Sequence, residues 1–181
     1  MYVLIKTRLI TLVIFVGLFS ISLELGSMYP INELDAREIL FDFMDTVEEI
    51  DSVGLFVNNV SLSLPMFIPG AGLIWGLYSG ASTGFTYGAI ASLTPELSGI
   101  PAVSILYTTV FGFLELIAYS IAMSRSYLLI YGIIKKSNLK SQLILLVIEI
   151  GIVSILLFVG GMLESSMFKQ AQQDILSIDD L

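Results

Sequence analysis

Two carboxylates stand in the middle of long apolar stretches of this chain, Glu115 and Glu149. An ionisable side chain inside a membrane is costly and is therefore a candidate functional group by default. Such a pair could relay protons or ions, or could form a polar binding pocket. The alternative is structural, a protonated acid that forms hydrogen bonds across helices. We expect no basic partner within the membrane, whereas Glu24 and Glu164 lie near the ends of apolar stretches and are expected to reach water.

Other polar side chains accompany Glu115. Small and polar residues recur at spacings of three and four, which places them on one face of a helix. They are Ser104, Thr108, Gly112, Glu115, Tyr119 and Ala122. An earlier stretch carries Ser79, Thr83 and Thr86, and we expect the two stripes to face each other. Asn58 and Asn59 complete the candidate polar site, either as lining residues or as a helix cap.

Most forms of catalysis are excluded by composition. The chain contains no cysteine and no histidine, so it has no thiolate, imidazole base or disulfide. It also lacks the patterns of a phosphate-binding loop, a nucleophile elbow or a zinc site. Carboxylates and amides could hold a metal ion, but none of their clusters has the required spacing. We therefore expect no catalytic residue, no metal and no cofactor in this chain, which could still belong to an enzyme complex.

The composition is that of an integral membrane protein. Of the 181 residues, 56% are hydrophobic and only 13% are charged, whereas a soluble domain is about a quarter charged. The net charge of −8 argues against nucleic acid as a partner. The expected fold is all-α, a polytopic membrane helix bundle in a single domain over residues 1–181.

A regular series of glycines predicts close helix packing. The five residues are spaced by four and are Gly72, Gly76, Gly80, Gly84 and Gly88. Each glycine costs a helix in water about 0.8–1 kcal/mol relative to alanine, but lipid enforces the helix. Its bare ridge lets another helix approach closely, and Gly112 is a sixth packing position. We expect packing within the chain, with an oligomer interface or a close-packed gate as alternatives.

Apolar length and breaker residues predict five membrane spans. They cover residues 9–28, 54–68, 71–92, 100–123 and 142–163. The first could be a cleaved signal peptide, but its apolar run is long and no A-x-A-like site follows, so a retained helix is favoured. The short second span either crosses the membrane or is re-entrant.

Polar segments connect these spans. An acidic amphipathic helix is expected over residues 33–52, capped by Asn32 or Asp35, as a solvated connection or a docking face. A basic loop with an amphipathic stretch follows at Ser124 to Lys140, and an acidic tail at 164–181.

The distribution of basic residues predicts the orientation. With five spans, six of the eight lysines and arginines fall on one side, which marks the cytoplasm. They are Lys6, Arg8, Arg125, Lys135, Lys136 and Lys140. We therefore expect a multi-pass protein of the cell membrane with a cytoplasmic amino terminus and an external carboxyl terminus.

The stretch from Asn58 to Ala122 resembles the stage II sporulation protein M family of multi-span membrane proteins. Phe56-Val57-Asn58-Asn59 is similar to an early Phe-x-x-Asn element of that family. Ser79-Gly80-Ala81-Ser82-Thr83-Gly84 is similar to its Asn-Gly-x-x-x-Gly element, with serine in place of asparagine. Gly112, Glu115 and Ala118 match its Pro-His-Gly-x-x-Glu-x-x-Ala signature, in which Val110 and Phe111 replace proline and histidine.

The resemblance implies a scaffold rather than a hydrolase, since the sporulation protein is associated with a membrane complex that remodels the cell wall. We expect a non-catalytic scaffold or accessory subunit whose partners are other membrane subunits and the lipid bilayer, with a homo-oligomer as a further option. One alternative is a small transporter or channel component that uses Glu115 and Glu149. Another is an accessory subunit of a membrane-bound redox or oxygenase enzyme.

Overall fold

The regular structure of the chain is helical throughout the residues described. The computed structural model describes the backbone of residues 2–49, 51–97 and 99–179, and side chains at 6–46, 51–97, 99–138, 140–167 and 170. In chain order the elements are α1 (Tyr2–Ser27), α2 (Glu33–Glu49), α3 (Ser52–Ser63), η1 (Leu64–Phe67), α4 (Ala71–Leu93), η2 (Pro95–Leu97), α5 (Val103–Thr108), α6 (Val110–Ile134) and α7 (Leu139–Asp179).

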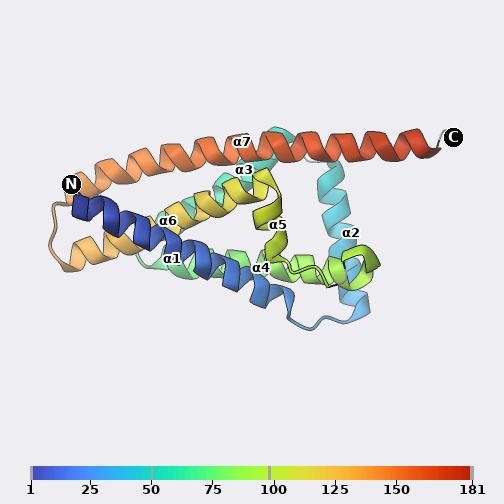
Figure 1. Cartoon of the computed structure of the whole chain (residues 1–181), viewed down its shortest axis with the longest axis horizontal. Helices are drawn as coiled ribbons and strands as arrows, with labels where there is room; N and C mark the ends of the chain where they lie inside the picture. Colours follow the sequence, from blue (N-terminus) through green and yellow to red (C-terminus); the bar gives the residue numbers. More distant parts are fainter. Residues whose placement is uncertain (1, 50, 98, 180–181) are drawn as a thin grey trace.

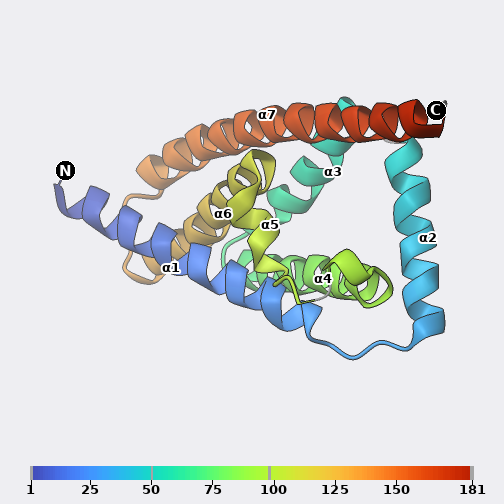
Figure 2. The same ribbon diagram turned by 45° about the vertical axis from the view of Figure 1, so that its right-hand side comes forward.

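The helices run back and forth along the long axis of the molecule. The amino terminus and the turn between α6 and α7 lie at one end, at the left of Figure 1. The opposite end holds α2, the segment after α4 and the carboxyl terminus. Figure 2 shows α2 lying across the direction of α7, whereas α7 extends along the whole bundle.

Among the described residues, three helical segments are long and apolar enough to cross a membrane, Lys6–Ser27, Val110–Ile134 and Lys140–Met167. Large apolar side chains cover the outside of α1 and α7, for example Val13 at 70% exposure and Val147 at 68%. An exposed apolar surface of this extent is typical of a lipid-facing protein. The helices predicted at 54–68 and 71–92 are present, but Ser52–Phe67 is short and α4 is rich in glycine and hydroxyl side chains.

The predicted helix at 100–123 is two helices. Thr109 has an extended backbone, with φ −103° and ψ 142°, and it separates α5 from α6. Its hydroxyl oxygen accepts the backbone N–H of Gly112 at 3.1 Å, so Thr109 is the N-cap of α6. A threonine cap needs only one residue and does not interrupt the apolar stretch between Ile100 and Met123. Hydropathy alone therefore does not locate the break between α5 and α6.

The prediction of a basic loop over Ser124 to Lys140 is wrong for most of its length. Helix α6 continues to Ile134, and the connection to α7 is confined to residues 135–138. Helix α7 likewise continues from Leu139 through most of the predicted tail at 164–181. The side chains of that tail from residue 171 onward, which include its acidic groups beyond Glu164, lie outside the described residues.

Helix α2 forms where the amphipathic pattern predicts it. Of the two predicted caps, Asn32 is the cap, since its Oδ1 accepts the backbone N–H of Asp35 at 3.0 Å. Ala36 is completely buried, whereas Leu34 and Phe41 on the other side are strongly exposed. The helix is therefore packed on one face only.

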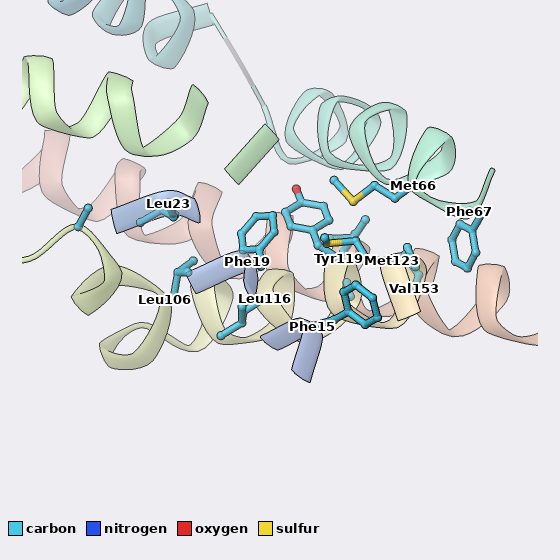
Figure 3. Packing of buried hydrophobic residues seen from close by; sticks show 14 residues of the cluster. Phe15, Phe19, Leu23, Met66, Phe67, Leu106, Leu116, Tyr119, Met123 and Val153 are labelled. Carbon is cyan, nitrogen blue, oxygen red and sulfur yellow. The ribbon is translucent and has the colours of Figure 1, made fainter. Parts of the chain in front are cut away.

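The apolar core forms where α1, α6 and α7 meet. Phe15, Phe19 and Leu23 are spaced by four on α1 and are buried. Figure 3 shows Phe19 beside Tyr119 of α6, with a distance of 5.4 Å between the two ring centroids. Val153 and Leu157 bring α7 into the same buried cluster.

The carboxyl-terminal half of the glycine series lies against the backbone of α1. A Cβ atom added at Gly84 would lie 1.8 Å from the carbonyl oxygen of Leu23, and one at Gly88 would lie 2.3 Å from that of Ser27. From the opposite side, a Cβ atom at Gly26 would lie 2.0 Å from the carbonyl oxygen of Ala81. No side chain fits between the two helices at these positions.

The remaining packing glycines have other neighbours. Gly72 lies against the backbone of Met66, and Gly76 lies against the flexible side chain of Met123. Gly80 has more room, since its added Cβ atom would lie 3.3 Å from the Phe19 ring. Gly112 lies in the first turn of α6 against the Ile105 carbonyl group. The series therefore packs mainly against α1 and η1, and at two positions, Gly72 and Gly76, also against side chains of α6.

We predict that Gly84→Ala destabilises the protein strongly, because the new methyl group would overlap a backbone oxygen that cannot move alone. The expected cost is about 1–3 kcal/mol, seen as a lower midpoint of thermal unfolding in detergent. The control is Gly17→Ala on α1, where a Cβ atom meets nothing within 4 Å. That variant should keep the wild-type midpoint or raise it. Equal midpoints for the two variants would contradict the α1–α4 backbone contact.

Candidate functional site

A cavity of about 320 Å³ lies between the helices, toward the end of the bundle that carries α2. All seven α-helices contribute to its wall. The lining residues are Phe19, Leu23, Phe43, Thr46, Leu55, Asn58, Asn59, Leu62, Ser79, Thr83, Leu106, Glu115, Tyr119 and Glu164. Its volume falls within the range of small-molecule sites, and its wall is mainly apolar with a few polar groups, which is the usual character of such sites.

Glu115 of α6 is held in this cavity by an asparagine. The Nδ2 of Asn59 donates to Oε1 of Glu115 at 2.5 Å, and the Nδ2 of Asn58 donates to Oδ1 of Asn59 at 3.3 Å. The N-cap of α3 is Asp51, whose carboxylate accepts the Gly54 N–H at 2.8 Å. Asn58 and Asn59 thus line a site and do not cap a helix.

Two further polar groups reach the cavity. Tyr119, one turn after Glu115 on α6, is only 7% exposed, and its hydroxyl group has no hydrogen bond within the described part of the chain. Glu164 of α7 also lines the cavity, although its position near the predicted span end suggested contact with water. Because α7 runs on past this point, the carboxyl group of Glu164 stays against the bundle. Glu24 was also expected to reach water. Its carboxyl group has a partner within the protein, because its Oε2 accepts the Val103 N–H at 3.0 Å.

The two polar stripes meet only in part. Ser79 and Thr83 of α4 share the cavity with Glu115 and Tyr119, as the stripe pattern predicts. Thr108 does not line it. Its hydroxyl is on the exposed side of α5 and donates to the Ser104 carbonyl group at 2.7 Å. The break at Thr109 changes the direction of the chain, so residues before and after it do not form one continuous helix face.

Glu149 lies in a separate centre, and the expectation that it has no basic partner is wrong. Arg125 donates to both carboxylate oxygens, from Nε at 2.6 Å and from Nη2 at 2.5 Å. Nη2 of Arg8 lies 2.8 Å from Oε2 of the same carboxylate. Arg125 is only 3% exposed. The sequence pattern places Arg125 in a loop, and only the continuation of α6 brings it to α7.

This charge cluster ties three helices together. Besides Glu149, Arg125 contacts Gln142 of α7 through Nη1 at 3.1 Å. Arg8 of α1 donates to the hydroxyl of Ser124 and, at 3.2 Å, to the carbonyl oxygen of Ile121. Charge-assisted hydrogen bonds from two arginines fix the position of this carboxyl group. The cluster is therefore suited to holding α1, α6 and α7 together.

The two centres are far apart along the bundle. Glu115 and Arg125 are separated by about 15 Å along α6, and Glu149 and Glu164 by about 22 Å along α7. Met123, Val153 and Leu157 are buried in between. Glu115 and Glu149, paired in the sequence-based hypothesis of a relay, are not brought together.

Comparisons with models of protein families, with curated proteins and with solved structures gave no match for this chain. The resemblance to the stage II sporulation protein M family accordingly rests on the quoted motifs alone. Of these, the structure places Asn59 and Glu115 in direct contact, although they come from two different elements of the motif set.

We predict that Glu149→Gln destabilises the protein, because it leaves two arginine side chains close together without their shared anion. Removing one partner of a buried ion pair typically costs about 3–5 kcal/mol. The matched control is Glu164→Gln on the same helix, since Glu164 forms no salt bridge among the described residues. Thermal unfolding in detergent should show a much larger loss for Glu149→Gln. The structural role of the cluster is refuted if both variants unfold at the same temperature.

Proposed function

We propose that this protein is a non-catalytic scaffold or accessory subunit of a larger membrane complex. The observation that carries the proposal is the outer face of α2. Leu34, Glu38, Phe41 and Asp45 follow one another at spacings of four, three and four, so they form one stripe along the helix. Leu34 is 80% and Phe41 70% exposed, while the opposite side is packed against the bundle through Ala36.

The residues of this stripe indicate what kind of surface could bind to it. Two large apolar side chains alternate with two carboxylates, so the complementary surface carries apolar and basic side chains. A second copy of this acidic helix would repel the first, and an anionic lipid surface would repel the carboxylates. We therefore infer a partner protein with a basic, apolar segment outside the membrane. The resemblance to a family of membrane scaffolds agrees with this inference, and an enzyme subunit could dock in the same way.

The arrangement of the helices supports five passes through the membrane. In Figure 1 the direction along the bundle alternates from α1 to α3 and η1, to α4, to α6, and to α7, while the short α5 runs across it. Helix α4 is not strongly apolar, but it packs between other helices, and a span shielded by protein does not need a fully apolar surface. The exposed lysines near the turn between α6 and α7 favour a cytoplasmic location for that end.

A small transporter or channel component is the second candidate, and only the cavity around Glu115 favours it. Glu149 has no part in that candidate function, because its charge is already balanced by Arg8 and Arg125. Buried apolar side chains, Met123, Val153 and Leu157, lie between the two centres. The scaffold function is the better supported of the two.

The topology predicts opposite labelling of two single-cysteine variants, which is simple to test because the chain has no native cysteine. Lys135→Cys should react with a membrane-impermeant maleimide only after the cells are opened. Glu96→Cys, in η2 at the other end, should react in intact cells. Labelling of both residues from the same side would overturn the five-pass orientation.

The docking face predicts that charge reversal releases the partner. The native protein, purified in mild detergent, should carry a stoichiometric membrane protein with a basic, apolar extramembrane segment. The double variant Glu38→Lys, Asp45→Lys should lose it, because repulsion replaces attraction, while thermal stability stays unchanged. The control Glu96→Lys reverses an exposed charge at the same end of the bundle and should retain the partner. A wild-type chain that purifies alone, or a partner retained by the double variant, would argue against the proposal.

A further inference from the structure

Polar groups that line the cavity have hydrogen-bonding capacity that is not used within the described chain. Tyr119 is only 7% exposed, and it lines the cavity with its hydroxyl group lacking a described partner. One turn away on α6, Oε1 of Glu115 accepts from Asn59, while Oε2 of Glu115 has no partner in the described structure. These unused groups point to a ligand that donates hydrogen bonds.

The polar residues that line the cavity favour a cationic ligand. Its polar members are two carboxyl groups, two amides and four hydroxyls, and none of its residues is lysine or arginine. The described residues contain no cluster of three or more histidine, cysteine, aspartate or glutamate side chains that could hold a metal ion. Divalent ions such as Ca²⁺ require six or more oxygen ligands, so two carboxylates among apolar walls suit them poorly.

The apolar part of the wall selects an organic cation. Phe19, Leu23, Leu55 and Leu106 form walls against which a hydrocarbon chain can pack. The Phe19 and Tyr119 rings lie 5.4 Å apart, so an ammonium group near Tyr119 also meets aromatic surface. A volume of about 320 Å³ accommodates a small amine with a short alkyl chain.

We propose that this cavity binds a primary ammonium group on a short hydrocarbon chain. The ammonium group donates to the carboxylates of Glu115 and Glu164 and to the hydroxyl oxygen of Tyr119, and the hydrocarbon chain packs on the apolar wall. The group could come from a free alkylamine or from the ethanolamine headgroup of a lipid. The free amine fits better, because the lining offers no basic side chain to a lipid phosphate. Binding here is independent of a partner on the outer face of α2.

The test is titration of the purified full-length protein in detergent with n-butylammonium chloride, followed by the midpoint of thermal unfolding. The midpoint should rise by a few degrees and reach a plateau, whereas n-butanol and sodium chloride should give no saturable rise. Equal effects of n-butanol and n-butylammonium would overturn the proposal, as would the absence of any saturable effect.

Variants assign the binding groups. Glu115→Gln should weaken the apparent affinity by at least about tenfold, because it removes a charge-assisted hydrogen bond. Tyr119→Phe should weaken it less, by about threefold to tenfold, and it keeps the proposal testable if Glu115→Gln does not fold. The control Glu96→Gln removes an exposed carboxylate outside the cavity and should bind like the wild type. Wild-type affinity in both cavity variants would overturn the proposal.

The two sources of the ammonium group are separated in lipid nanodiscs. In phosphatidylcholine discs the saturable effect of n-butylammonium should match that in detergent. Adding phosphatidylethanolamine should leave it unchanged if the ligand is a free amine. A loss of the effect on adding phosphatidylethanolamine would assign the same site to the lipid headgroup. If n-butylammonium has no saturable effect on the unfolding midpoint in pure phosphatidylcholine discs, the proposal is contradicted.

Discussion

The backbone contact between α1 and α4 is the constraint on which the rest of this structure depends. There is no room for a side chain at Gly26, Gly84 and Gly88. At these positions each glycine lies directly against a backbone carbonyl oxygen of the other helix. The hydroxyl of Ser22 adds a hydrogen bond to the Leu77 carbonyl group at 2.5 Å. Phe19 and Leu23 lie on the α1 side of this contact and line the cavity. Ser79 and Thr83 of α4 line it beside them. Without hydrophobic driving force in lipid, such close packing is what holds helices together.

The two polar centres follow different physical rules. At Glu149 the charge is balanced by Arg125 and Arg8, and every group of the cluster has a neighbour of suitable chemistry. At Glu115 the partner is a neutral amide, and the nearby Tyr119 hydroxyl has no described partner. The first centre is closed and rigidifies one end of the bundle. The second retains unused acceptors around an accessible volume, which is the property expected of a binding site.

Helix α2 lies between the cavity and the outer surface of the protein, at the end of the bundle opposite the charge cluster. Phe43 and Thr46 on its inner side line the cavity, while Leu34 and Phe41 on its outer side are exposed. The two proposed functions therefore use opposite faces of a single helix, one toward a small ligand and one toward a partner protein. The acidic residues of α2 whose side chains are described are exposed, so water or a basic partner can compensate their charge.

The sequence by itself determined the class of the protein, since lipid selects for apolar length and for internally hydrogen-bonded helices. Periodicity located α2 and the glycine helix α4, and the types of residue at Asn58, Asn59, Thr83 and Glu115 indicated four side chains that line the cavity. Tertiary structure decided which polar groups meet. Whether Arg125 ends in a loop or against Glu149 depends on the continuation of α6, and whether Glu164 reaches water or the cavity depends on the path of α7. These outcomes are set by contacts between residues far apart in the chain, and local patterns carry no information about such distances.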